Sequence, residues 1–171
     1  MANLNFKSGD SPIGQVNNGQ STLNPNDWQT NHVVYANLDS LNRTSNPNTA
    51  YLEKRNATND SLRVRQYVDP TGWHSNHGGT QIYNRGHVIA YSISKGISQN
   101  GNYEPNLQSG DQNNLKNLFT QTAYANQSIQ TIYEKEVRDA LYQNKKVIYQ
   151  AHAIFRGNEK MARGFTRRLL I

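Results

Sequence analysis

The stretch QIYNRGHVIAYSIS, residues 81–94, combines strand-forming residues with two chemically active side chains. Aromatic and β-branched residues without proline predict a β-strand. Arg85 and His87 stand two positions apart, and residues at this spacing in a strand face the same side. A guanidinium and an imidazole on either side of Gly86 suit a phosphate ester and a base that activates water. The alternative is a strand end at which both side chains simply reach solvent.

A second pair, Asn126 and Glu134, lies within a segment, residues 123–143, whose apolar residues recur at spacings of three and four. This periodicity predicts an amphipathic helix. The pair is separated by about two helical turns, so both side chains lie on roughly the same side. Amide and carboxylate oxygens are hard donors that suit Mg²⁺, which keeps most of its waters. The alternative is a surface helix in which Glu134 pairs with Arg138.

Other familiar catalytic or metal-binding patterns are absent from the sequence. It contains no phosphate-binding loop, no G-x-S-x-G elbow and no H-E-x-x-H. The absence of cysteine excludes disulfides, thiolate metal sites and a cysteine nucleophile. His74 and His77 lie on a glycine-rich turn without a third ligand nearby, so a structural or solvent-exposed role is predicted for them.

The charge of the chain favours polyanionic partners. The formal net charge is +6 and the sequence pI is about 9.6, which is typical of proteins that bind nucleic acid or another anionic surface. The alternative is that the charge serves solubility alone. No apolar run approaches the ~18 residues of a membrane span, and the first residues, MANLNFKSGD, lack the apolar centre of a signal peptide.

The pattern along the chain indicates one domain preceded by a polar arm. Residues 1–30 are rich in Asn, Gly, Ser and Gln and are predicted to form the arm, and residues 31–171 the domain. Alternation in LRVRQYV, residues 62–68, predicts a half-buried strand, and KKVIYQAHAIF, residues 145–155, predicts another. A long polar loop is expected over residues 94–114. The final TRRLLI suggests a missing last strand or a partner surface.

Taken in order, NRGHVIAYSIS, NLFTQTAYANQ and IYEKEV resemble the DNA/RNA non-specific endonucleases of the ββα-metal (His-Me finger) group. YANLDSLNR and DPTGWH are similar to the branch of secreted streptococcal DNases, the streptodornases, and related bacterial surface and toxin nucleases. The resemblance covers residues 35–155. It implies an α+β fold with an antiparallel sheet and a ββα-metal motif, in which a hairpin and a helix face one another.

The resemblance implies roles for the two pairs. His87 matches the general base that deprotonates water, and Arg85 matches an arginine near the phosphate. Asn126 matches the direct protein ligand to Mg²⁺, with Mn²⁺ as a substitute, and Glu134 matches an acid that holds metal-bound water. The implied reaction is hydrolysis of phosphodiester bonds in DNA, with RNA as a further substrate left open, to products that carry a 5′-phosphate.

Further positions also match the family. Asn117 corresponds to a residue that supports the site by positioning His87 or the phosphate, and Gln121 and Gln127 correspond to substrate-binding positions. Asn84 departs from the aspartate that many members carry, which keeps hydrogen bonding but loses the charge. Members commonly continue into a further strand, so the chain is expected to be truncated at its C-terminus or a short member.

Two other functions remain open from the sequence. The first is a catalytically weak nucleic-acid-binding module, in which the same residues serve phosphate binding. The second is a toxin-complex domain whose basic surface binds an acidic inhibitor or immunity protein. The resemblance implies a secreted or cell-surface bacterial protein, or the nuclease domain of a toxin.

Overall fold

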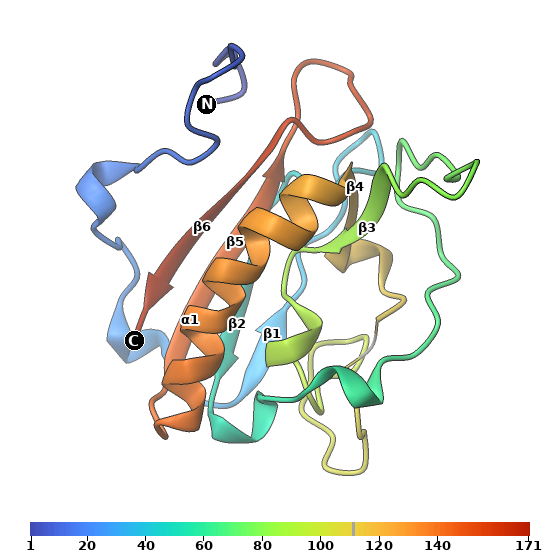
Figure 1. Ribbon diagram of the computed structural model, residues 1–171. Helices are drawn as coiled ribbons and strands as arrows, with labels where there is room; N and C mark the ends of the chain where they lie inside the picture. The colour runs from blue at the N-terminus through green and yellow to red at the C-terminus, as the bar shows by residue number, and fades with distance from the viewer. Residues whose placement is uncertain (111) are drawn as a thin grey trace.

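The computed structural model describes residues 1–110 and 112–171 and contains two antiparallel sheets (Figure 1). The larger sheet has the strand order β1-β2-β5-β6, and the smaller sheet pairs β3 with β4. The strands are β1 (His32–Val34), β2 (Asn48–Leu52), β3 (Tyr83–His87), β4 (Leu118–Thr122), β5 (Val147–Ile154) and β6 (Gly164–Leu170). Helix α1 (Thr131–Tyr142) follows directly on a π-helix (Ala125–Gln130).

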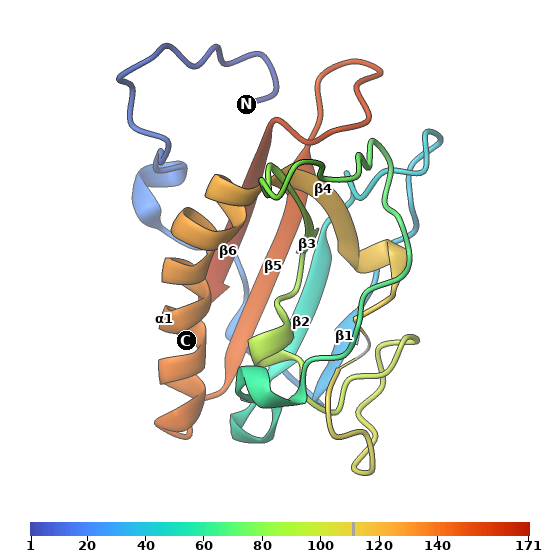
Figure 2. The same ribbon diagram turned by 45° about the vertical axis from the view of Figure 1, so that its right-hand side comes forward.

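Helix α1 lies across one face of the four-stranded sheet, and the β3–β4 pair lies beside its N-terminal end (Figures 1 and 2). In the chain, the π-helix and α1 closely follow β4, whereas residues 88–117 separate β3 from β4. The two antiparallel strands and the helix are therefore adjacent in space, although β3 comes from an earlier part of the chain. This arrangement confirms the predicted α+β class with antiparallel sheets.

The core forms between α1 and the larger sheet. Strands β2 and β5 bury alternate residues, as a sheet with one covered face requires. Helix α1 contributes Val137, Ala140 and Leu141, all buried, at spacings of three and four. The predicted helix over residues 123–143 and the predicted strand over residues 145–155 are both confirmed. Their strong periodicity is the reason, since each places its apolar residues on one face.

The predicted strand over residues 62–68 is wrong. After a short 3₁₀-helix (Asp60–Leu62), this segment runs without regular structure. Asn113 binds its main chain instead, accepting from Tyr67 N at 2.8 Å and donating to Arg65 O at 3.1 Å. The alternating apolar residues find no sheet face to cover, and Tyr67 is 75% exposed.

The strand predicted over residues 81–94 is shorter than expected. Strand β3 ends at His87, and a 3₁₀-helix (Tyr91–Ile93) follows. Beyond β3, the main chain of Ile89 bonds to the side chain of Asn117 rather than to a strand. The apolar run is nevertheless buried, because this turn lies within the core.

The C-terminal end of the chain belongs to the larger sheet, and the N-terminal end contacts the connection between β5 and β6. The last residues form β6, which pairs with β5 at the sheet edge, and Leu169 packs against the core. The apolar end therefore belongs to a strand of this chain. At the other end, Arg156 donates to the carbonyls of Ala2 and Leu4. The division into an arm and a domain stays a prediction. In the described part of the chain, no helix has the length and apolarity needed to cross a membrane.

Candidate active site

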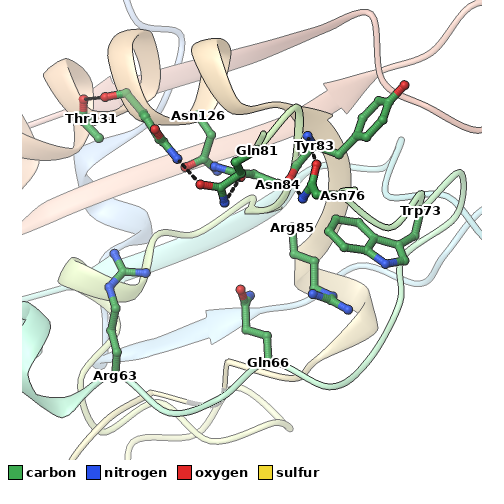
Figure 3. Close-up of a pocket in the computed structure, with 11 residues that line it drawn as sticks. Arg63, Gln66, Trp73, Asn76, Gln81, Tyr83, Asn84, Arg85, Asn126 and Thr131 are labelled. Atoms are coloured by element: carbon green, nitrogen blue, oxygen red, sulfur yellow. Dashed lines mark hydrogen bonds between the residues drawn. The ribbon is translucent and has the colours of Figure 1, made fainter. Parts of the chain in front are cut away.

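A polar cavity of about 480 Å³ lies where β3 meets the π-helix and the start of α1 (Figure 3). The helical segment with Asn126 and Thr131 forms one side, while Arg63 and Gln66 approach from the opposite side. None of the described residues that line it is acidic. The lining is formed by Arg63, Gln66, Trp73, Asn76, Gln81, Tyr83, Asn84, Arg85, Asn126, Gln127 and Thr131.

His87 is buried at the edge of this cavity, 9% exposed. Its Nε2 lies 3.2 Å from the carbonyl oxygen of Gln112, and the side-chain amide of Gln66, a lining residue, lies 3.4 Å from the same nitrogen. The Gln112 carbonyl can only accept, so this contact, the shorter of the two, favours the tautomer with the proton on Nε2. The lone pair of the imidazole then belongs to Nδ1. This tautomer gives His87 the form that a base needs.

Arg85 lines the cavity with its guanidinium held from three directions. Its Nε donates to the carbonyl of Val68 at 2.9 Å, and Nη2 pairs with Asp69 at 2.6 Å. The ring of Trp73 stacks against it, with the guanidinium carbon 4.0 Å from the ring centroid. The side chain is 21% exposed. The guanidinium is therefore fixed in orientation but still accessible to an anion.

Asn126 and Gln127 also line the cavity, from within the π-helix. Residues eight apart in an α-helix differ by about 80° around the axis. The extra residue of a π turn reduces this difference to about 20°. The π-helix thus brings Asn126 and Glu134 closer to one face than an uninterrupted α-helix would.

Glu134 lies one turn beyond Thr131 and is not part of the cavity lining. The charge of Glu134 affects Tyr149, which lies in strand β5 of the larger sheet. Burial raises the pKa of Tyr149 above its ordinary value, Arg167 opposes this rise, and Glu134 adds to it. The carboxylate of Glu134 is thus within electrostatic reach of β5.

Two predicted site residues, Asn117 and Gln121, lie behind the cavity. Asn117 is 2% exposed and bonds twice to Ile89, accepting from its N–H at 2.7 Å and donating to its carbonyl at 2.9 Å. Gln121 is 5% exposed and donates to Gln130 at 2.8 Å. The structure therefore brings Arg85, Asn126 and Gln127 together in the lining, with His87 adjoining and these two amides in support.

Asn84, at the position where many family members carry aspartate, belongs to a chain of amides. Gln81 donates to Asn84 Oδ1 at 2.6 Å, and Gln127 donates to Gln81 Oε1 at 3.2 Å. Thr131 donates to the carbonyl of Gln127 at 2.9 Å. These bonds join the start of β3 to the helix (Figure 3). The side-chain amide of Asn84 accepts this hydrogen bond from Gln81 without carrying the charge of an aspartate.

Sequence reasoning missed Arg63, Gln66 and Trp73 as lining residues. Arg63 and Gln66 belong to the segment that was wrongly predicted as a strand. Its alternation of apolar and polar residues suggested that they were ordinary polar residues of that strand. Trp73 belongs to DPTGWH, which supported the resemblance to the family but was given no role in the site. The closeness of Val68 and Asp69 to Arg85 depends on contacts sixteen and seventeen residues apart, which local spacing does not reveal.

The donors that this cavity offers fit Mg²⁺ better than softer metals. Asn126 supplies an amide oxygen, and the described residues contain no group of three or more His, Asp or Glu that could form a cage. Mg²⁺ binds through few protein oxygens and retains waters. His74 packs against Tyr83, with ring centroids 5.4 Å apart, in agreement with the structural role predicted for it.

Comparison with known proteins agrees with this arrangement. The sequence matches the family described as DNA/RNA non-specific endonuclease over residues 21–169. The crystal structure of NucA from Streptococcus agalactiae with a magnesium ion bound is similar, with a TM-score of 0.69 and 26% identity over 90% of this chain and 70% of that chain. The same protein without metal gives a TM-score of 0.67 at the same identity and coverage.

A third structure, an extracellular endonuclease, shares the fold, with a TM-score of 0.57 and 22% identity over 88% of this chain and 66% of that chain. The family match extends over most of the described residues, including the β3–β4 pair and the helix that follows. The chain therefore belongs to the DNA/RNA non-specific endonuclease family and is a nuclease.

Proposed function

We propose that this nuclease is a Mg²⁺-dependent endonuclease that cuts DNA without sequence specificity and leaves 5′-phosphate products. The observation that carries the proposal is the state of His87. A carbonyl oxygen holds its Nε2 at the edge of a cavity that also contains Arg85 and Asn126. A base, a cation and an amide oxygen that can bind Mg²⁺ can together support phosphodiester hydrolysis.

His87 would act as the general base. Its Nε2–H bond to Gln112 fixes the ring and directs basicity to Nδ1. Nδ1 takes a proton from a water molecule, and the oxygen of that water attacks phosphorus. The bond between phosphorus and the 3′-oxygen breaks, which leaves the phosphate on the 5′ side. Burial protects the base from competing contacts with bulk solvent.

Arg85 would hold the reacting phosphate. Arginine donates from a planar fork that matches phosphate oxygens. The contacts of Arg85 with Val68 and Trp73 keep the fork in one orientation, so little side-chain freedom is lost on binding. Asp69 occupies one donor until substrate arrives, and its exposed carboxylate can turn to solvent.

Asn126 would hold the metal directly, and Glu134 would orient water in its coordination shell. When bound, Mg²⁺ supplies positive charge that stabilises the leaving 3′-oxygen. Asn126 lines the cavity, and Glu134 lies eight residues further along the same helical segment. We also propose Gln127 as a substrate contact, because its amide is exposed in the lining.

The deciding experiment is digestion of supercoiled plasmid DNA with Mg²⁺, and separately with EDTA, by the wild type and by His87→Ala. His77→Ala is a matched control, since His77 lies on an exposed turn. We expect cutting by wild type and His77→Ala only with Mg²⁺. His87→Ala should be slower by about 10²–10⁴-fold. Turnover by His87→Ala close to that of wild type would refute His87 as the base.

Location and protein partners stay predictions from the sequence. Export to the bacterial surface or medium, origin as a toxin domain, and binding of an acidic inhibitor are all compatible with a basic nuclease. Cleavage of RNA is a further prediction. Digestion of a single-stranded RNA under the same Mg²⁺ conditions tests it directly.

A further inference from the structure

Two buried glutamines connect the strand that carries His87 to the helical segment that carries Asn126. Gln130, the last residue of the π-helix, is 6% exposed and donates from Nε2 to the main-chain carbonyl of His87 at 2.8 Å. Gln121 in β4 donates from Nε2 to Gln130 Oε1 at 2.8 Å. The two bonds form a relay that we name the glutamine relay, from Gln121 through Gln130 to His87.

The relay fixes the orientation of its central amide. The oxygen of Gln130 accepts from Gln121, so its nitrogen must face the carbonyl of His87. Both side chains are buried and both bonds are short. A buried polar network in which the members satisfy one another is rigid, whereas a network with a missing member leaves costly unpaired groups.

Gly86 shows how closely the relay packs against β3. A Cβ atom at this position would lie 2.2 Å from Gln121 Nε2 and 2.7 Å from its Cδ. Any larger residue would therefore push the Gln121 amide out of the relay. The glycine between Arg85 and His87 leaves the space that the Gln121 side chain occupies.

The relay also spans two parts of the candidate site. The bond from Gln130 ends on the main chain of His87 itself, so it positions the residue and not only its ring. On the other side, Gln130 lies four residues after Asn126 within one helical segment. The relay is thus a direct connection between His87 and the helical segment that carries Asn126.

We propose that Gln130, oriented by Gln121, is a positioning residue that sets His87 relative to Asn126. The inference rests on the proposed function, in which these two residues are the base and the metal ligand. It assigns Gln121 a supporting role instead of the substrate contact that the resemblance implied. A displacement of about 1 Å between reacting groups can cost about 10²-fold in rate.

The test uses Gln130→Met, which keeps length but removes both hydrogen bonds. Gln150→Met is the matched control, because the Gln150 amide likewise donates one hydrogen bond, to Thr49, and accepts one, from Arg168, but lies in the larger sheet. We expect kcat of Gln130→Met to fall about 10- to 100-fold. KM should stay within about threefold, because phosphate contacts elsewhere supply substrate affinity.

A second measurement separates positioning from simple loss of folded protein. Mn²⁺ in place of Mg²⁺ broadens the NMR signals of nearby protons, and the broadening falls steeply with distance. In the wild type, the His87 ring signals should broaden on addition of Mn²⁺, and Gln130→Met should alter this broadening. If Gln130→Met does not fold, Gly86→Ala gives a milder disturbance of the same relay and should show the same effects at smaller size.

The outcomes distinguish the inference from the function on which it rests. A large kcat loss with changed Mn²⁺ broadening in Gln130→Met, and neither in Gln150→Met, supports the relay. If Gln130→Met retains kcat while His87→Ala is inactive, the relay is refuted and the function stands. Activity loss that matches the loss of folded protein, with unchanged broadening, also refutes the relay. An active His87→Ala refutes the proposed function itself.

Discussion

The side-chain amide of Asn117 replaces a strand partner for Ile89, with hydrogen bonds of 2.7 Å and 2.9 Å to its N–H and carbonyl. Ile89 is completely buried and lies two residues beyond His87. Asn117 therefore fixes the turn where β3 ends. Without this amide, two main-chain groups would be left in the core without partners.

We expect Asn117→Ala to destabilise the fold by about 2–6 kcal/mol, since it leaves two buried groups unsatisfied and each costs about 1–3 kcal/mol. Urea unfolding followed by circular dichroism measures this change. Asn158→Ala is the control, because Asn158 is exposed. Equal stability of the two variants would show that Asn117 does not hold the turn.

A second prediction concerns metal dependence. Asn126→Ala should abolish Mg²⁺-supported cutting but leave DNA binding in EDTA nearly unchanged, because Lys and Arg contacts with phosphates dominate affinity. Mg²⁺ titration of cutting rates and a filter-binding assay measure the two effects. Asn158→Ala again serves as a control. Parallel loss of binding and cutting would mean that Asn126 supports structure and not the metal.

The sequence predicted the parts of the fold that have strong periodicity. The helix over residues 123–143 was foreseen because apolar spacing determines the face it buries. The irregular structure of residues 62–68 was not foreseen. The main chain of this segment is held by hydrogen bonds with the Asn113 side chain and not by a neighbouring strand. Arg85 and Asn126 could be identified from short motifs. Gln130 could not, because its role depends on a bond to a residue 43 positions away.

A third prediction concerns the geometry of Arg85. Arg85→Lys should lower kcat about as severely as Arg85→Ala, because an ammonium cannot keep the bond to Val68, the pair with Asp69 and the stack on Trp73 together. DNA affinity should change less than kcat in both variants, since one phosphate contact among several is altered. Single-turnover cutting and binding in EDTA separate the two quantities. Wild-type kcat in Arg85→Lys would show that charge alone suffices.

A fourth prediction concerns acid stability. Partial burial favours a higher pKa for Asp39, but hydrogen bonds from Ser45 and Arg43 outweigh it and lower the pKa to about 2. A carboxyl with a depressed folded pKa stabilises the fold above its unfolded pKa of about 3.9, and this contribution is lost as the pH falls towards 2. Asp39→Asn should therefore be less stable than wild type at about pH 6 but nearly equal at about pH 2. Urea unfolding at both pH values tests this. A stability gap that does not narrow in acid would contradict the assignment.

The last prediction concerns how the chain holds its substrate. With a net charge of +6, affinity for duplex DNA should come mainly from phosphates, so the logarithm of affinity should fall linearly with the logarithm of salt concentration. The expected slope is about −0.9 for each phosphate contacted. Phosphate contacts carry no direct base information, and DNA shape alone should bias the cutting positions.

Sequencing the ends from a brief digest of a long duplex measures that bias. Ends spread along the duplex, with preference only for flexible steps, are the expected result. Arg63→Ala should reduce the salt slope by about one phosphate contact, because Arg63 lines the cavity opposite the helix with Asn126. Ends confined to one short recognition sequence would overturn the non-specific assignment, whatever the salt dependence.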